Sequence, residues 1–462
     1  MSLVETTSKR PARRGAGEYR EALLRGWGRG APTRARLVRP ASADRLAELL
    51  GAGPAGGAIP RGAGRSYGDP AQNEGGAVLD MTALAGVRRV DAALGEVRVG
   101  AGTTFATLLE GLAERGLTLP VVPGTRHLTV GGAIAADVHG KNHPAAGSIA
   151  HQLVSFKLVT PAGEVHEVSR ESDPDLFRAT TGGMGLTGAI TSATLSVVPL
   201  REPFALADVD RAGSIEDAMS LIDGGGHTHA IAWLDLLASG GRFTRAVVTR
   251  SREGEAPAGA ASLALSARPL LRVPPGAPGA LLRAAAVRTF NAALWHRSPR
   301  GERDRPIGAA EQLFPLDRVA DWNRLYGRQG LIQYQFAVPA GGAWAMRCIL
   351  EMLRARRVPM FLGSLKRLGA PSGGLLSFPL DGWTLAIDIP ARAHRVADAL
   401  EDADRLVAGA GGRIYLAKDA RVRAETLREM YPQLARFRAV RERVDPAGTM
   451  RSDMARRLEL SE

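Results

Sequence analysis

Residues 60–69, PRGAGRSYGD, combine glycines with polar side chains in a pattern that suits anion binding. Gly62, Gly64 and Gly68 fall within a short stretch and let the backbone curl, so that its N–H groups turn toward an anion. The stretch therefore predicts a phosphate-binding loop. For a single loop of this kind, an ordinary glycine turn is an equally good interpretation.

A second segment, residues 123–143 (PGTRHLTVGGAIAADVHGKNH), again joins paired glycines to polar residues, and a third glycine cluster lies within 173–199. Three such loops with interleaved Arg, Ser, Tyr, Thr and His predict a large phosphate-bearing cofactor. The first loop is neither a dinucleotide fingerprint in a strand-to-helix crossover nor a Walker A sequence. His139 and His143 are four residues apart, but no carboxylate pair or second thiolate accompanies them, so we predict no metal site.

Regular elements must position these loops. Between 104 and 115, apolar residues recur at helical spacing, with Thr103 or Thr104 as N-cap and Gly116 as the stop. The other elements expected before residue 200 are a helix over 43–50, strands over 76–80 and 96–100, a hairpin over 153–168, and a short helix followed by a long strand within 173–199.

The composition changes near residue 200. Beyond it, strands outnumber the crossovers that a parallel sheet needs, which predicts a mixed or antiparallel sheet with helices on one face. The expected strands are 229–237, 243–249, 331–338 and 383–389, and the expected helices are 341–356 and 391–407. Residues 251–310 are rich in Pro, Gly and Arg and are expected to form a long, partly mobile loop over a site.

Length and charge limit the possible classes of protein. A chain of 462 residues with 45% hydrophobic content favours two domains. The formal net charge of +13 is compatible with an anionic ligand, a nucleic acid or an acidic membrane, but arginine scattered through an Ala/Gly-rich chain favours a compositional bias. No nucleic-acid-binding signature accompanies the charge. The single cysteine, Cys348, lies in a helical pattern and is expected to be buried.

No secretory signal or spanning apolar run of about 18 residues is visible, which favours a cytoplasmic protein or one peripheral to the cell membrane. Residues 1–18 are expected to form a flexible basic leader.

Six segments together carry a resemblance to a known family. In chain order they are PRGAGRSYGD, PGTRHLTVGGAIAADVHGKNHPAAGS, LFRATTGGMGLTG, IQYQF, YLAKDAR and DPAGTMRSDMARRLEL. They resemble the flavoprotein oxidase subunits of decaprenylphosphoryl-β-D-ribose 2′-epimerases, in the vanillyl-alcohol-oxidase-like FAD superfamily. The resemblance implies an α+β fold with an FAD-binding domain over 19–201, a sheet-based substrate domain over 202–412, and a return to the FAD domain over 413–462.

The resemblance also implies a reaction. The ribose 2′-hydroxyl of a polyprenyl-phosphate sugar is oxidised to a ketone, and an NADH-dependent short-chain reductase partner completes the epimerisation to the arabinose. Alcohol oxidation releases a proton as well as a hydride, so the site needs a base or a cation beside the oxygen. The resemblance assigns catalytic roles to Lys418, His139 and Tyr67. From the sequence alone, a surface lysine capping a strand is the preferred interpretation of Lys418.

Residues that bind FAD are implied in the same way. They are Arg61, Gly62, Ala63, Gly64, Arg65, Ser66, Tyr67, Pro123, Gly124, Thr125, Thr129, Gly131, Gly132, Ala136, His139, Gly140, Ile190 and Tyr415. Many relatives attach FAD through a histidine before the serine of the first loop. This chain has Arg65 there, so we expect noncovalent FAD.

The implied substrate residues are Lys141, Trp233, Gln333, Gln335, Lys366 and Ala386. Lys141 and Lys366 are assigned to the lipid phosphate, and the two glutamines share one face of a strand. The mycobacterial enzymes carry cysteine at the position of Ala386 and asparagine at that of Thr384. Two alternatives stay open: an FAD oxidase of a soluble sugar or alcohol, and a noncatalytic binder of flavin or lipid phosphate.

Overall fold

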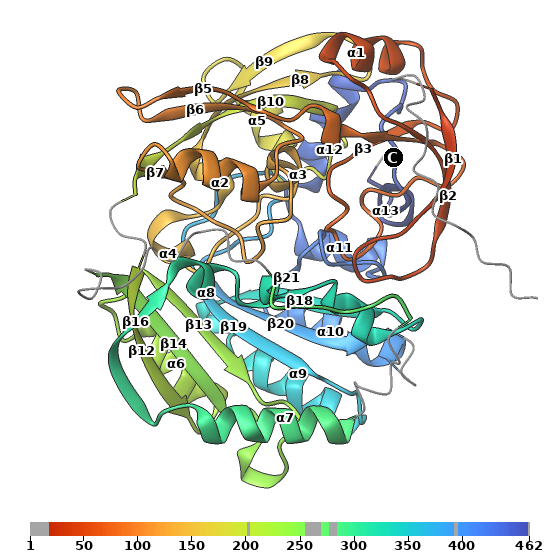
Figure 1. The fold of residues 1–462 in the computed structure, drawn as a ribbon. Helices are drawn as coiled ribbons and strands as arrows, with labels where there is room; N and C mark the ends of the chain where they lie inside the picture. Colours follow the sequence, from red (N-terminus) through yellow and green to blue (C-terminus); the bar gives the residue numbers. More distant parts are fainter. Residues whose placement is uncertain (1–17, 201–203, 255–268, 277–283, 392–395, 461–462) are drawn as a thin grey trace, which may run out of the picture.

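The computed structural model describes residues 18–200, 204–254, 269–276, 284–391 and 396–460. Two sheets built before residue 200 form the upper half of Figure 1. The first has the order β1 (Arg20–Leu24), β2 (Thr33–Val38), β4 (Ala77–Asp80), β3 (Ala58–Arg61). The second has the order β5 (Val87–Asp91), β6 (Glu96–Gly100), β10 (Ala189–Ser196), β8 (Leu153–Val159), β9 (Val165–Ser169).

Short capped helices connect these strands. Helix α2 (Phe105–Ala113) begins after Thr104, whose side chain accepts a hydrogen bond from the Thr107 N–H, and its apolar stripe is buried as the spacing predicts. The helices α1 (Ala43–Gly51) and α5 (Pro174–Thr180) and the β8–β9 hairpin also match the expected elements. Helix α3 (Val130–Ala135) begins after Thr129, whose hydroxyl accepts from the Gly132 N–H.

An eight-stranded sheet forms the lower half of Figure 1. All its strand pairs are antiparallel, which confirms one of the two expected sheet types. Its order is β16 (Gly301–Gly308), β12 (Phe204–Ala212), β14 (Ala246–Glu253), β13 (His229–Leu234), β19 (Leu362–Leu368), β20 (Gly382–Pro390), β18 (Leu331–Pro339), β21 (Arg413–Ile414). The limits of the two domains remain a prediction.

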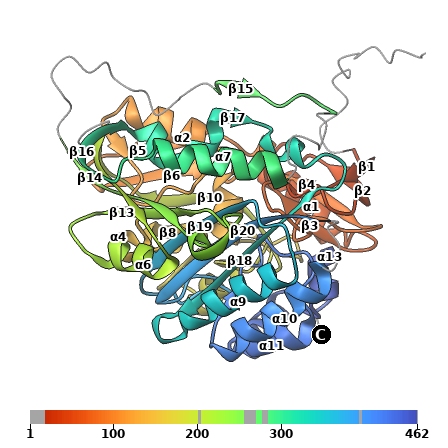
Figure 2. The ribbon, with the colours of Figure 1, turned by 90° about the horizontal axis from the view of Figure 1, so that it is seen from below.

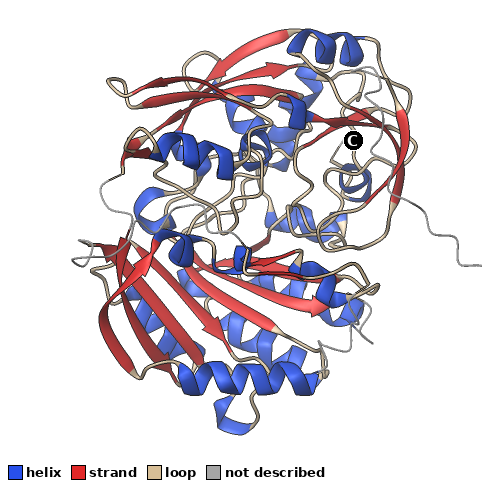
Figure 3. Cartoon of the chain, viewed as in Figure 1, coloured by secondary structure: helices blue, strands red, loops and turns tan. Residues whose placement is uncertain are grey.

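Helices cover one face of this sheet, as Figure 3 shows in blue behind the red strands. Helix α6 (Ile215–Asp223) packs on β12, β13, β14 and β19, while α10 (Val396–Gly409) packs on β18 and on α9 (Trp344–Ala355). Buried residues such as Leu365, Leu385 and Phe336 fill the layer between helices and strands. Alternate residues of the same strands therefore point to the opposite face.

The loop expected over 251–310 is wrong for residues 284–308, which form α7 (Ala284–Arg297) and the edge strand β16. Helix α7 runs across the sheet in Figure 2. Only Val287 and Asn291 of this helix are buried, so no apolar stripe marks it in the sequence. Most residues of the edge strand β16 are also not buried, so the sequence shows no apolar alternation there either. Residues 255–268 and 277–283 of the expected loop, and the leader up to residue 17, lie outside the described residues.

The C-terminal segment returns to the first sheets. It contains α11 (Ala424–Met430), α12 (Leu434–Val444) and α13 (Asp453–Arg457). Arg457 donates to Asp69, next to the first glycine loop, and forms an ion pair with Asp419 at 2.9 Å. The Tyr67 N–H donates to the Ala417 carbonyl at 3.0 Å. These contacts place the YLAKDAR segment beside the first glycine loop.

Two smaller observations complete the fold. Cys348 is exposed on α9, because Met346, Ile349 and Leu350 occupy the buried stripe of that helix, so the expectation of a buried thiol is wrong. Among the described residues, no helix is long and apolar enough to cross a membrane.

Candidate active site

A cavity of about 1060 Å³ lies between the glycine loops and the eight-stranded sheet. This volume is at the upper end of the ~300–1,000 Å³ typical of small-molecule sites, so the cavity suits a large ligand. The floor is the sheet face opposite the one that α6, α9 and α10 cover. Its lining residues come from four consecutive strands of the sheet: Ile231 and Trp233 on β13, Leu362, Ser364 and Lys366 on β19, Ala386 on β20, and Gln333 and Gln335 on β18.

Strand register sets which floor residues are neighbours. Trp233 lies opposite Ser364, Ser364 opposite Ala386, and Ala386 opposite Gln335. These four side chains form one row across the floor, as expected for cross-strand neighbours. The predicted substrate residues Trp233, Ala386 and Gln335 therefore meet in one row of the floor, and Gln333 lies in the row of Asp388.

The first glycine loop leaves a run of backbone donors unused. Within the described chain, the N–H groups of Ala63, Gly64, Arg65 and Ser66 donate no hydrogen bond. A Cβ on Gly62 would lie 2.1 Å from the Thr129 hydroxyl, so the loop approaches α3 more closely than any other residue type allows. Free backbone donors in a glycine loop fit the phosphates of a cofactor.

Two arginines of this loop behave differently from each other. Arg65 lines the cavity, with its guanidinium carbon 4.0 Å from the centroid of the Trp27 ring. Arg61 does not line the cavity; its guanidinium donates to the carbonyls of Arg25 and Ala71. The Arg61 side chain thus shapes the loop, and a contact of Arg61 with FAD stays a prediction.

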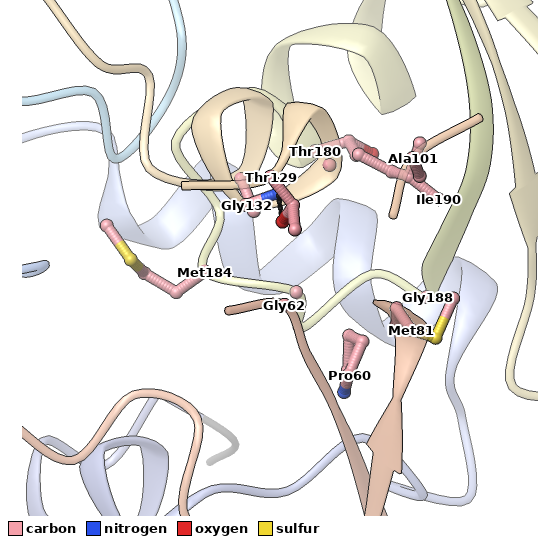
Figure 4. Close-up of a pocket in the computed structure, with 13 residues that line it drawn as sticks. Pro60, Gly62, Met81, Ala101, Thr129, Gly132, Thr180, Met184, Gly188 and Ile190 are labelled. Atoms are coloured by element: carbon pink, nitrogen blue, oxygen red, sulfur yellow. Dashed lines mark hydrogen bonds between the residues drawn. The ribbon is translucent and has the colours of Figure 1, made fainter. Parts of the chain in front are cut away.

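The segment before α3 is held by a carboxylate from the other half of the molecule. Asp317 accepts from the Thr125 hydroxyl at 2.8 Å and from the Arg126 N–H at 2.9 Å. Behind the segment, a second cavity of about 50 Å³ is lined by Gly131 and Ile190 (Figure 4). It shares Gly62, Thr129 and Gly132 with the large cavity, so the two form adjoining parts of one site.

His139 is held as a neutral ring. The Gln335 side-chain N–H donates to His139 Nε2 at 3.2 Å, and His139 Nδ1 faces the Gly140 carbonyl at 3.3 Å, which assigns the ring proton to Nδ1. Burial lowers the pKa of His139 well below its usual value, and Lys366 lowers it further. Gln335 also donates to the Thr384 hydroxyl, so both amide hydrogens are used and its carbonyl oxygen is left for a ligand.

Lys418 lies at the same site. It lines the cavity, and its Nζ lies 3.8 Å from the centroid of the Tyr67 ring. Burial lowers the pKa of Lys418 to about 7, while Asp388 raises it and Lys366 lowers it. An amine with this pKa is partly neutral near pH 7 and is able to accept a proton.

Lysine is rare in this chain, which makes its placement informative. The five lysines are Lys9, Lys141, Lys157, Lys366 and Lys418, and three of them line this cavity. Burial lowers the pKa of Lys141 to about 7 and that of Lys366 to about 8, and Lys366 contributes to the shift at Lys141. Arginine keeps its proton near pH 7–8, whereas a lysine with a lowered pKa is able to gain and lose one. This arginine-rich chain therefore has lysines in the cavity, where a change of charge is useful.

Most of the predicted site residues meet in the large cavity. Its lining contains Gly62, Ala63, Gly64, Arg65, Ser66, Tyr67, Pro123, Gly124, Thr125, Thr129, Gly132, Ala136, His139, Gly140, Lys141, Trp233, Gln333, Gln335, Lys366, Ala386, Tyr415 and Lys418. Tyr415 stacks on Phe378 with ring centroids 4.5 Å apart and donates to the Ala136 carbonyl, which holds the end of α3.

Among the residues at or beside the site that were not predicted from the sequence are Asp317, His229 and Asp388. His229 lines the cavity, and burial followed by repulsion from Lys141 lowers its pKa to about 4. Asp388 interrupts the apolar strand LAIDIP, a buried carboxylate that sequence inspection is able to flag. Asp317 lies in a short turn with no such signal.

The described residues contain no group of three or more His, Cys, Asp or Glu side chains able to hold a metal ion. The rings of His139 and His143 are 6.1 Å apart, and each has other partners. The absence of a metal remains a prediction.

Comparison with known proteins gives the family. Residues 35–169 match the family described as FAD binding domain, and residues 390–458 match D-arabinono-1,4-lactone oxidase. The decaprenylphosphoryl-β-D-ribose oxidase of Mycolicibacterium smegmatis is 37% identical over 453 residues, which cover 95% of this chain and 97% of that protein. The chain belongs to the decaprenylphosphoryl-β-D-ribose oxidase family. Members of other families are more distant: L-gulono-1,4-lactone dehydrogenase of Mycobacterium tuberculosis is 26% identical over 446 residues, 91% of this chain and 95% of that protein.

As a member of the decaprenylphosphoryl-β-D-ribose oxidase family, the chain is an FAD-dependent oxidoreductase with the expected two-part α+β fold. The residues present fit FAD, because the loop over 62–66 offers unused N–H donors and the two adjoining cavities extend from that loop to the sheet. FAD, when bound, accepts the hydride that an alcohol carbon loses on oxidation.

Proposed function

We propose that this protein oxidises the ribose 2′-hydroxyl of decaprenylphosphoryl-β-D-ribose, or of a similar polyprenylphosphoryl ribose, to the 2′-keto sugar. The observation that carries the proposal is the presence of three lysines in one cavity, two of them with a pKa of about 7. Lys418 accepts the hydroxyl proton. Lys141 and Lys366 bind the phosphate, whose negative charge favours their protonated forms.

The other proposed contacts follow from the lining of the cavity. Gln335 offers its carbonyl oxygen to a sugar hydroxyl, and Tyr67 and neutral His139 limit the space around the reacting carbon. FAD is noncovalent in this proposal, because Arg65 stacks on Trp27 where many relatives attach the cofactor through histidine. Acid precipitation should then release all of the flavin into the supernatant; yellow precipitate would contradict this.

The product is a ketone, so a reductase must follow to complete an epimerisation. We propose an NADH-dependent short-chain reductase as partner and a peripheral association with the membrane that holds the lipid substrate. Co-purification of such a reductase, and flotation of the protein with lipid vesicles, test these two points separately.

An oxidase of a soluble sugar or lactone is the second candidate. It is favoured by the match of residues 390–458 to D-arabinono-1,4-lactone oxidase. Lys141 and Lys366 argue against this candidate, because an uncharged sugar offers no negative charge to their ammonium groups.

Anaerobic mixing decides between the candidates. Purified protein is mixed with a short-chain prenylphosphoryl ribose, with ribose, or with a sugar lactone, and the absorbance of oxidised flavin is followed. Bleaching by the phosphoryl ribose at a rate far above that with the other two supports the proposal. Equal bleaching by the uncharged compounds would favour the second candidate.

A further inference from the structure

Asp388 is a buried carboxylate, and only one of its two oxygens has a hydrogen-bond partner among the described residues. It lies on β20 opposite Gln333 of β18 and is 1% exposed. Its Oδ1 accepts from the Gln333 side-chain N–H at 2.7 Å. Its Oδ2 is buried and has no hydrogen-bond partner within the described residues.

The fold itself gains little from this charge. Burying a carboxylate oxygen without a partner is unfavourable, unless a nearby cation compensates. Asparagine at this position would accept the same hydrogen bond from Gln333 and would carry no charge. A negative charge at residue 388 therefore needs an explanation outside the packing of the sheet.

The cation on which Asp388 acts is Lys418. Asp388 favours the protonated form of Lys418, and Lys418 in turn favours the ionised form of Asp388. Lys366, on the neighbouring strand β19, disfavours the protonated form of Lys418. The two residues thus act on Lys418 with opposite signs.

The other groups around this pair come from several elements. The ring of Tyr67 lies beside Lys418, and Lys418 also acts on His139. Asp388 acts on the hydroxyls of Tyr67 and Tyr326, and the Gln333 amide interacts with the Tyr67 hydroxyl. Arg65 lowers and Asp317 raises the pKa of the Tyr67 hydroxyl. Among these groups, Asp388 is the carboxylate that acts directly on Lys418.

We propose that Asp388 is a positioning residue for the oxidation, and that it stabilises the Lys418 ammonium formed when the substrate loses its hydroxyl proton. This inference rests on the proposed function. The substrate O–H bond breaks and its proton forms an N–H bond on neutral Lys418. The C–H bond breaks as a hydride that bound FAD accepts, so the alcohol is oxidised by two electrons to a ketone. Gln333 holds the carboxylate in place during the transfer.

The test is Asp388→Asn, which keeps the volume and the acceptor for Gln333 and removes only the charge. We measure the limiting rate of anaerobic flavin reduction at saturating short-chain prenylphosphoryl ribose across pH. The wild-type rate should rise as Lys418 loses its proton. Without the carboxylate Lys418 loses its proton more readily, so the rise should move by about one pH unit toward acid, and the plateau should fall about tenfold because the base is weaker.

Lys366→Met should shift the pH dependence of the rate in the opposite direction. Removal of this cation should move the rise toward alkaline pH, because Lys418 then holds its proton more firmly. A purely structural effect of either substitution would lower the rate without moving the rise.

A second readout does not need turnover. Competitive acetylation of the resting holoenzyme, followed by peptide mass spectrometry, reports the pKa of Lys418, with the partly exposed Lys157 as internal reference. Asp388→Asn should make Lys418 reactive at lower pH.

The outcomes are distinct. Superimposable pH profiles and labelling curves for wild type and Asp388→Asn would overturn the inference, as would an Asp388→Asn protein that does not fold, since the charge would then serve the fold. If the substrate does not reduce the wild-type flavin, the proposed function fails. In that case unchanged labelling would reject the coupling of Asp388 and Lys418 as well, whereas shifted labelling would support it.

Discussion

The Nζ atom of Lys418 lies 3.8 Å from the centroid of the Tyr67 ring. One residue comes from the first glycine loop and the other from the C-terminal return. The hydrogen bond from the Tyr67 N–H to the Ala417 carbonyl and the contacts of Arg457 with Asp69 and Asp419 hold them together. The first glycine loop and the C-terminal return thus form one side of the active site, and the eight-stranded sheet forms its floor.

Lys418→Met should lower the rate of anaerobic flavin reduction by about 10²–10⁴-fold, the usual contribution of a general base. The flavin spectrum should stay unchanged, because the pyrophosphate loop is not altered. Lys157→Met is the matched control: this lysine lies on β8 outside the cavity, and its loss should leave the rate as in wild type. A Lys418→Met enzyme as fast as the control would remove Lys418 from the mechanism.

The buried lysines should make the folded state more stable as the pH rises. Lys366 has a pKa of about 8 in the fold, below the usual value of 10.5, so the unfolded chain binds more protons between these two values. The destabilisation is full below about pH 8 and disappears above about pH 10.5. Because a pKa difference of one unit corresponds to about 1.36 kcal/mol, Lys366→Met should be up to about 3 kcal/mol more stable than wild type at pH 7. Denaturant titrations at pH 7 and at pH 10.5 measure the difference, which should vanish at the higher pH.

Gly62→Ala should weaken FAD binding at least tenfold. The added Cβ would lie 2.1 Å from the Thr129 hydroxyl, so the loop or the start of α3 must move. Thr129→Ala in the same protein should restore part of the affinity by removing that hydroxyl, although it also removes the N-cap of α3 at about 1 kcal/mol. Flavin fluorescence on titration of the apoprotein measures both effects.

Gly111→Ala is the control for that series, because Gly111 lies in α2 and a Cβ there would meet only Val87 at 4.0 Å. Equal loss of FAD affinity in the control would show that helix or loop stability in general, and not the approach of the loop to α3, governs binding.

Ala386→Cys should create a reactive position in the cavity. Ala386 lines the floor between Gln335 and Ser364, and the natural chain has no thiol there. In a Cys348→Ser background, which removes the exposed native thiol, a nitroaromatic compound that labels the mycobacterial enzymes should modify only the Ala386→Cys protein. Intact mass spectrometry checks this. An Ala386→Cys protein that stays unmodified, or an adduct on the Cys348→Ser parent, would show that the assignment of this position is wrong.

Local patterns in the sequence determined much of this protein. The apolar spacing and cap of α2, the β8–β9 hairpin and the alternation of IQYQF in β18 are all readable from the chain, because burial on one face imposes a period of 3.6 or 2 residues. The glycine loops and the family resemblance were enough to indicate FAD and an oxidase. Elements without a buried stripe, such as α7 and β16, gave no pattern and were mistaken for a loop.

Only the tertiary structure decided which polar residues act together. Three of the five lysines converge because the loops, β19 and the C-terminal return meet at one cavity, and their lowered pKa values come from that shared burial. Burial and Lys366 keep His139 neutral, Gln335 fixes which ring nitrogen carries the proton, and Asp388 acts on the charge of Lys418, all across different strands. Electrostatic coupling depends on distance in space and on desolvation, and neither is encoded in the local order of residues.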